Sequence, residues 1–126
     1  MTKRIFCLLT LIPLLSSCYQ QEQNCADFKT GTFKFELEID GVTKTSTFIR
    51  MNDIEIETFE GKVDTSSIRW VNDCEYILKK LHPKNMAEEK AVNMRIITTK
   101  GNTYTFEYGL VGDSRRERGV IEKIAE

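Results

Sequence analysis

Apolar and polar residues alternate along much of the chain from residue 32 onward, which is the pattern of half-buried strands. In the clearest case, Thr32 to Asp40, four apolar side chains point to one face and charged side chains point to the other. The dipeptide Asp40-Gly41 follows, and it favours a tight hairpin turn. The next segment, Thr43 to Arg50, is rich in threonine, which favours strands. The pattern therefore predicts a β-hairpin at this point.

Similar segments continue to the end of the chain. Turn residues separate them at Asn52-Asp53, Gly61, Asn72-Asp73, Lys100-Gly101-Asn102 and Gly112-Asp113-Ser114. The predicted strands are Ile54 to Phe59, Ser66 to Val71, Cys74 to Leu78, Val92 to Thr98, Tyr104 to Leu110, and Gly119 to Ile124, with Val120 and Ile124 in the core. The only helical passage that we predict is Asn85 to Lys90, where Asn85 and Glu88 have capping-box spacing.

About eight strands joined by short turns predict an all-β fold. Consecutive hairpins make neighbouring strands antiparallel. A meander of this kind tends to close on itself, because closure removes the exposed sheet edges. We predict an antiparallel up-and-down meander that forms a small barrel or half-barrel, with a β-sandwich as the alternative.

The start of the chain has a different character. Lys3 and Arg4 precede an apolar run, Ile5 to Leu15. This run is shorter than the roughly 20 residues of a spanning helix and is typical of a secretory signal. The motif Leu15-Ser16-Ser17-Cys18 resembles the lipobox of bacterial lipoproteins. The resemblance implies cleavage before Cys18, a diacylglycerol on its sulfur and an acyl chain on its amine; an ordinary signal peptide or a core helix is the alternative.

Three parts follow from this reading: a signal peptide (1–17), a lipidated tether (18–24) and a single β domain (25–126). Tyr19 follows the lipid site where an aspartate would favour inner-membrane retention. We therefore predict anchoring to the cell envelope at the outer membrane, on its periplasmic or surface side. The whole chain has a net charge of −1, and loss of Lys3 and Arg4 makes it more acidic. We expect no nucleic-acid partner, no cofactor besides the covalent lipid, and a monomer.

The cysteines need separate explanations. Cys7 lies in the signal peptide, and Cys18 is the lipid site. Cys25 and Cys74 form an even pair in an exported chain, and oxidising compartments favour disulfides. We predict a bridge that closes a loop of about 50 residues, with two buried free thiols as the alternative. The lone histidine, His82, has no second histidine or cysteine nearby, so we predict no metal site.

Few residues suggest catalysis. Glu55 and Glu57 alternate along one strand, about 7 Å apart. That spacing would suit paired acid catalysis, but it is also the pattern of a solvated strand face, which we predict. A lone histidine excludes most serine or cysteine triads, and no glycine-rich phosphate loop occurs. Four aspartates are predicted at turns rather than at a calcium site: Asp40, Asp53, Asp64 and Asp73. We predict no enzyme.

Aromatic residues are the main candidates for a binding site. In a barrel they would converge inside, where they line an apolar pocket or fill a solid core. Because the strands are short and the side chains large, we expect filling. The residues are Phe33, Phe35, Trp70, Tyr76, Tyr104, Phe106 and Tyr108.

Four segments carry a resemblance to a family. They are residues 29–33, 67–76, 85–90 and 104–108, and they resemble small uncharacterised lipoproteins of Flavobacteria and related Bacteroidota. Some of those proteins carry the label "DNA topoisomerase IV", which does not fit a short exported chain without an ATP site. The resemblance implies a lipocalin-like β fold and implies no established activity.

Three functions remain open. The first is a non-catalytic binding or accessory domain of the cell envelope, which holds a small apolar molecule or an envelope protein. The second is a structural envelope lipoprotein with a solid core. The third, which we favour least, is a hydrolase, and a pocket that unites Glu55 or Glu57 with other perturbed acids would favour it.

Overall fold

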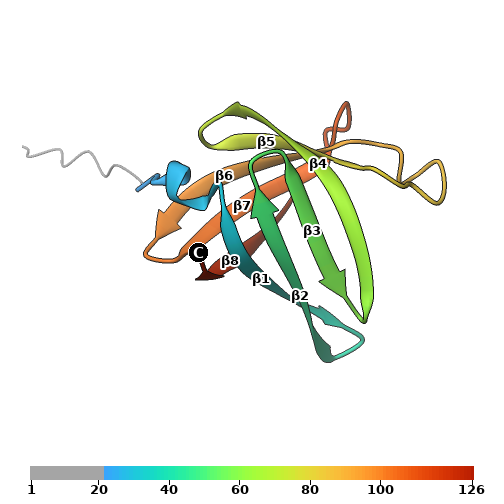
Figure 1. Ribbon diagram of the computed structural model, residues 1–126, viewed down its shortest axis with the longest axis horizontal. Helices are drawn as coiled ribbons and strands as arrows, with labels where there is room; N and C mark the ends of the chain where they lie inside the picture. The colour runs from blue at the N-terminus through green and yellow to red at the C-terminus, as the bar shows by residue number, and fades with distance from the viewer. Residues whose placement is uncertain (1–21) are drawn as a thin grey trace, which may run out of the picture.

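The computed structural model describes residues 22–126, which form a closed antiparallel β-barrel of eight strands (Figure 1). A short 3-10 helix, η1 (Cys25–Phe28), precedes the strands. The strands are β1 (Gly31–Ile39), β2 (Val42–Met51), β3 (Ile54–Phe59), β4 (Lys62–Asn72), β5 (Glu75–Lys80), β6 (Val92–Lys100), β7 (Thr103–Leu110) and β8 (Glu117–Ala125). The predicted meander is confirmed. It closes into a barrel, and it forms neither the half-barrel nor the β-sandwich that the sequence left open. The predicted signal peptide, Cys18 and Tyr19 lie outside the described residues.

Each strand pairs with its neighbours in sequence, and β1 closes the barrel by pairing with β8. Two of the tight turns explain why the hairpins form where the sequence predicts turns. Asp40 and Gly41 both have positive φ angles, 52° and 76°, and so do Glu60 and Gly61, at 50° and 77°. A two-residue turn of this handedness matches the twist of the flanking strands. The Asp40-Gly41 turn and the break at Gly61 are therefore confirmed.

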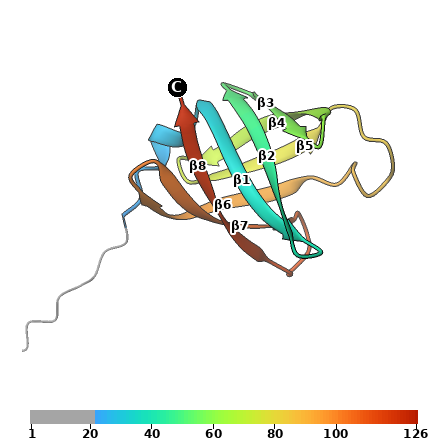
Figure 2. The same cartoon turned by 90° about the horizontal axis from the view of Figure 1, so that it is seen from below.

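The two ends of the barrel differ. In an up-and-down meander alternate turns gather at the same end, so the turns after β2, β4 and β6 share one end with η1 (Figure 2). We call this the plug end, and the opposite end, with the turns after β1, β3, β5 and β7, the mouth. The chain enters at the plug end, where the Thr99 amide donates to the Glu22 carbonyl at 2.8 Å. The last residues of the predicted tether therefore already contact the barrel.

Three local predictions are wrong. Asn85 to Lys90 forms turns and no helix, although the capping contacts exist: the Glu88 amide donates to the Asn85 side chain at 2.9 Å. The segment is too short to repay helix nucleation. Val120 and Ile124 are exposed on β8, where Ile121 is the buried residue instead. Asp64 lies inside β4 rather than at a turn.

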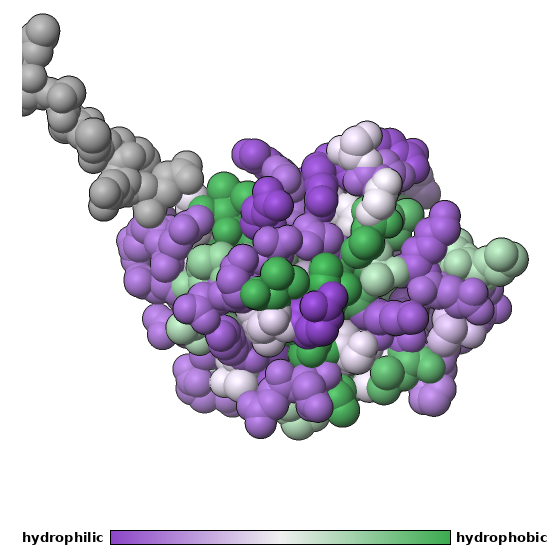
Figure 3. All heavy atoms as spheres, turned by 90° about the horizontal axis from the view of Figure 1, so that it is seen from above, coloured by the Kyte–Doolittle hydropathy of each residue, from purple (hydrophilic) through white to green (hydrophobic). Residues whose placement is uncertain are grey.

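The outer surface is mixed. On the face that Figure 3 shows, apolar residues lie in small groups among polar ones. Ile49 and Met51 lie on the outer face of β2 and are exposed, whereas the residues that alternate with them on the inner face include Ser46 and Arg50. Within residues 22–126, no helix has the length and apolar character needed to cross a membrane.

Candidate ligand-binding site

The plug end is closed by η1 and held by a disulfide. Cys25 of η1 is bonded to Cys74, in the turn between β4 and β5, with the two Cα atoms 5.2 Å apart. The predicted bridge is therefore confirmed. Phe28, at the end of η1, is fully buried and packs edge-on against the Tyr104 ring, with centroids 5.0 Å apart. The helix thus caps the barrel with its own apolar side chain.

Above Phe28 lies Arg50 of β2, a buried cation whose three nitrogen atoms all donate to protein groups. Its Nε donates to Glu55 at 3.1 Å, and its Nη1 donates to the Phe28 carbonyl at 2.7 Å. Its Nη2 donates to the hydroxyls of Tyr76 and Tyr104 at 2.8 and 3.1 Å and lies 3.0 Å from the Glu55 carboxylate. A buried charge is tolerated when it is paired and hydrogen-bonded in this way.

Aromatic rings surround the same guanidinium. Its carbon atom lies 4.7 Å from the ring centroids of Phe33 and Tyr76 and 5.3 Å from that of Phe48. Trp70 is farther away, at 5.8 Å. Cations are attracted to the faces of aromatic rings, and the attraction strengthens where water is excluded. The rings and the hydrogen bonds together fix the position of Arg50.

The charge states of this network follow from burial and pairing. Burial alone would lower the pKa of Arg50, but Tyr76, Tyr104 and Glu55 outweigh it and raise that pKa, so Arg50 stays charged. Burial raises the pKa of the Glu55 carboxyl, and the Arg50 guanidinium opposes that rise. Burial also raises the pKa values of both tyrosine hydroxyls, which therefore stay neutral.

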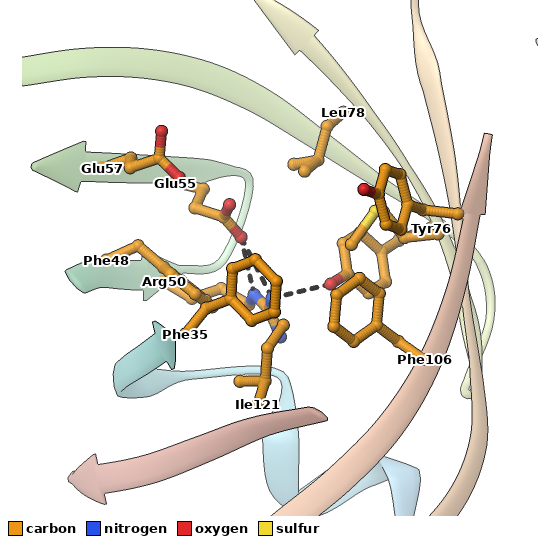
Figure 4. Close-up of a pocket in the computed structure, with 11 residues that line it drawn as sticks. Phe35, Phe48, Arg50, Glu55, Glu57, Tyr76, Leu78, Phe106 and Ile121 are labelled. Atoms are coloured by element: carbon orange, nitrogen blue, oxygen red, sulfur yellow. Dashed lines mark hydrogen bonds and ion pairs between the residues drawn. The ribbon is translucent and has the colours of Figure 1, made fainter. Parts of the chain in front are cut away.

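Between this network and the mouth lies a cavity of about 230 Å³ (Figure 4). Arg50 and Glu55 lie at its floor. Its lining is mainly aromatic and aliphatic, and the carboxylates come from β3. The lining residues are Phe35, Phe48, Arg50, Glu55, Glu57, Tyr76, Leu78, Met94, Phe106, Tyr108 and Ile121.

A glycine on β8 shapes the apolar wall. A Cβ atom at Gly119 would lie 2.8 Å from the Phe106 ring and 2.9 Å from the Phe35 ring. The absence of a side chain lets these two rings pack edge-to-face with centroids 5.5 Å apart. Any larger residue at position 119 would push them into the cavity.

Glu57 is the second carboxylate of the cavity. The buried Ser46 hydroxyl donates to its Oε2 at 2.9 Å. Among residues 22–126, no lysine or arginine forms an ion pair with Glu57, and no group donates to its Oε1. The side chain is half-buried. It therefore presents a positioned carboxylate with a free acceptor atom.

The loop between β5 and β6 borders the mouth. A second pocket of about 280 Å³ lies there and shares Glu55, Glu57 and Leu78 with the cavity. Lys80 lies between Asp64 at 3.3 Å and Glu88 of the loop at 3.0 Å. The hydrogen bond from Lys80 to Glu88 is the main cause that raises the pKa of Lys80. These contacts tie the loop to the rim of the barrel.

The predicted aromatic residues divide between the two halves of the interior. Phe33 and Tyr104 are packed at the plug end, and half-buried Trp70 packs on Tyr76, with its buried Nε1 lacking a hydrogen-bond partner among the described residues. The others line the cavity: Phe35, Tyr76, Phe106 and Tyr108. The prediction of a filled interior therefore holds at the plug end and not in the half toward the mouth.

The prediction of a solvated face for Glu55 and Glu57 is wrong, because both face the cavity. Arg50 was not predicted as a site residue. A signal was available: Asn52-Asp53 is a two-residue turn, so Arg50 and Glu55 are cross-strand partners. Phe48 lies two residues before Arg50 and therefore shares its face of β2. An inward Phe48 thus places Arg50 and its partner Glu55 inside the barrel.

Within the described part of the chain, no group of three potential metal ligands occurs.

Comparison of the chain with models of protein families, with curated protein sequences and with solved structures finds no match. The resemblance to Bacteroidota lipoproteins therefore stays a prediction from the sequence. The proposal on function therefore rests on the barrel and its cavity.

Proposed function

We propose that this protein is an envelope lipoprotein, held by lipid on Cys18, whose barrel binds a small and largely apolar molecule. The observation that carries the proposal is the cavity of about 230 Å³, with apolar walls above a charged floor. Ligand sites are typically concave and apolar with a few placed polar groups. An apolar cavity of roughly 150 Å³ in another protein holds benzene, so an aromatic ring with a short chain suits this volume.

The floor of the cavity supports a preformed site. Arg50 makes hydrogen bonds to η1, β3, β5 and β7, and the disulfide fixes η1 to the turn before β5. A site whose walls are already fixed loses little conformational entropy when it binds a ligand. The rigid plug end therefore favours a binding role for the open half.

The proposed anchor gives the barrel an orientation. The described chain begins at Glu22, beside β6 at the plug end. Glu22 is four positions after Cys18, and an extended chain spans at most about 3.5 Å per residue. A lipid on Cys18 would keep the plug end within roughly 14 Å of the membrane surface. The mouth would face away from the bilayer, so we propose that ligand enters from the aqueous side.

A hydrolase is the second candidate, because Glu55 and Glu57 share one cavity and burial raises the pKa of Glu55. Paired carboxylates with separated pKa values are a common acid–base arrangement. Glu55, however, is bonded to Arg50 through both Nε and Nη2. A carboxylate fixed in this way serves the structure of the floor, so we propose binding rather than catalysis.

Methionine-methyl NMR tests the cavity, with the mature protein held in nanodiscs of zwitterionic lipid. Met94 lines the cavity, whereas Met51 and Met86 are exposed on the outside and serve as internal controls. Titration with 3-phenylpropan-1-ol should shift the Met94 signal alone in a saturable way. Equal shifts of all three signals, or none, would contradict the proposal.

A matched pair of variants locates the binding. Leu78→Trp places a large ring where Leu78 lines the cavity and should abolish the Met94 response. Leu81→Trp adds the same bulk at an exposed position just after β5 and should leave the response unchanged. Equal binding by both variants would place the ligand elsewhere.

Intact mass spectrometry tests the anchor. We expect a chain that begins at Cys18, carries acyl groups, and gains the mass of two hydrogens on reduction of Cys25–Cys74. Cys18→Ser should remove the lipid and release the protein from the membrane fraction. A full-length chain without fatty acid in the cytosol would sink the lipoprotein proposal.

A further inference from the structure

We infer that the ligand is an amphipathic cation: a compact hydrocarbon or aromatic body that carries one protonated amine, with Glu57 as its counter-ion. This inference rests on the proposed binding function and names the chemical class of the ligand. Two features of the cavity carry it, the distribution of charge and the free acceptor on Glu57. Neither feature follows from an apolar cavity alone.

The charge distribution comes first. Three charged side chains line the cavity: Arg50, Glu55 and Glu57. Arg50 and Glu55 form an ion pair at 3.0 Å, so their charges compensate each other at the floor. Glu57 has no such partner among residues 22–126. The cavity therefore carries one uncompensated negative charge beside apolar walls.

The lysines at the rim do not supply the missing charge. Lys80 is held between Asp64 and Glu88, and Lys90 is exposed on the loop. Neither lysine lines the cavity itself. Both line the second pocket, which Glu57 shares, but neither forms an ion pair with Glu57. A cationic ligand that enters from the mouth would therefore find Glu57 available.

An anionic ligand fits less well. Arg50 is the only cation of the cavity lining, and its Nε, Nη1 and Nη2 already donate to Glu55, Phe28, Tyr76 and Tyr104. An anion would have to compete with these buried contacts for Arg50 and would lie beside two carboxylates. Both requirements oppose binding.

The geometry around Glu57 suits an ammonium group. Ser46 holds Oε2 at 2.9 Å, which fixes the carboxylate on β3 and leaves Oε1 as an acceptor. The opposite wall presents the rings of Phe106 and Tyr108, which stack with centroids 5.4 Å apart. Figure 4 shows Glu57 and Phe106 on opposite sides of the cavity, so a ligand with an ammonium group at one end and an apolar body at the other can face both.

Three ligands of the same shape test the inference: 3-phenylpropan-1-amine, 3-phenylpropan-1-ol and 3-phenylpropanoate. Dissociation constants come from the Met94 methyl shift of the mature protein in zwitterionic nanodiscs. We expect the amine to bind about tenfold more tightly than the alcohol, because hydrogen bonds to charged groups are the stronger ones. The carboxylate should bind more weakly than the alcohol.

Glu57→Gln removes the charge and keeps an acceptor for Ser46. In this variant the amine and the alcohol should bind within about twofold of each other. Glu38→Gln is the matched control, because Glu38 is exposed on β1 and lines neither pocket. It removes the same charge from the protein and should preserve the tenfold preference.

The outcomes separate the two proposals. If none of the three ligands shifts Met94, the proposed binding function fails with the inference. If alcohol and amine bind equally to the wild type, or the carboxylate binds best, the cavity binds ligands but the cation inference is wrong. If Glu38→Gln lowers the preference as much as Glu57→Gln, the preference arises from net charge and not from Glu57, which also overturns the inference.

Discussion

Glu55 and Glu57 lie two residues apart on the same strand and face the same interior, yet their surroundings differ. Glu55 is paired with Arg50 at the floor of the cavity and is buried. Glu57 lies nearer the mouth, where Ser46 is the one hydrogen-bond partner of its side chain among the described residues. The comparison shows how one barrel can use similar residues for two purposes, to fix a floor and to present a charge.

The two ends also differ in how completely they are packed. At the plug end Phe28, Phe33 and Tyr104 are fully buried and contact one another. Toward the mouth the interior opens into the cavity, and Leu78 and Tyr108 are only half-buried. Stability should therefore depend mainly on the plug end, and changes near the mouth should affect binding more than folding.

The largest effect is expected from Arg50→Met. Loss of the guanidinium leaves the Glu55 carboxylate buried without its counter-charge and the Phe28 carbonyl without its donor. We expect the free energy of unfolding to fall by about 5 kcal/mol, measured by urea unfolding with Trp70 fluorescence. Glu55→Gln, which keeps a hydrogen-bond acceptor, should cost about 3 kcal/mol.

Arg69→Met is the control for this prediction, because Arg69 is exposed on β4. Its effect should stay within about 0.5 kcal/mol. If Arg50→Met were equally mild, the plug end would not be the rigid half of the molecule. The contrast on which the proposed site depends would then fail.

The next largest effect is expected from loss of the Cys25–Cys74 bond. The bond joins residues 49 positions apart, and in the chain-entropy model a loop of this length contributes about 4 kcal/mol. Urea unfolding with and without dithiothreitol measures the effect, and Cys25→Ser with Cys74→Ser should reproduce the reduced state. Identical unfolding midpoints would show that noncovalent contacts, such as those of Phe28 and Arg50, are enough to hold η1.

Sequence reasoning predicts one wall of the barrel well and the other poorly. On β1, β7 and most of β6, apolar residues alternate with polar ones, and Phe33, Ile96 and Tyr104 lie inside as the pattern indicates. On β2 and β3 the inward residues include Arg50 and Glu55, while Ile49 and Ile56 face outward. Hydrophobic alternation assigns the wrong face there, because it assumes an apolar interior.

The candidate site was therefore only partly predictable. The aromatic wall could be listed from the alternation, but the cavity depends on how large side chains pack around Gly119, which spacing does not reveal. The Arg50–Glu55 pair depends on the register across a two-residue turn. An inward Phe48 would have identified this pair, since Arg50 lies two positions after Phe48 and shares its face of the strand.

The third prediction concerns alkaline pH. Burial raises the pKa values of Tyr76 and Tyr104 above the usual 10, so these hydroxyls stay neutral in the folded state and ionise in the unfolded state. Their contribution to stability is complete below pH 10 and is lost as pH rises from 10 toward the folded pKa values. Each tyrosine should lower stability by up to about 1.4 kcal/mol per pH unit in that range.

The measurement is the urea midpoint between pH 8 and 11 for the wild type and Tyr76→Phe. The variant should be less stable at pH 8, because Arg50 loses an acceptor, but its stability should fall less steeply above pH 10. The pKa of Tyr108, near the mouth, is also raised, to about 12. Its main cause is the hydrogen bond to Glu117, whereas burial is the main cause for Tyr76. Parallel curves for wild type and Tyr76→Phe would contradict a neutral buried hydroxyl.

The smallest effect on stability is expected from Glu57→Gln, within about 0.5 kcal/mol. The amide keeps an acceptor for the Ser46 hydroxyl, and no ion pair with a described residue is lost. Urea unfolding beside Glu55→Gln gives the direct comparison of the two carboxylates. If Glu57→Gln cost as much as Glu55→Gln, Glu57 would serve the fold in the same way as Glu55. A near-zero cost, together with loss of amine preference, would instead identify a charge that stabilises a ligand rather than the barrel.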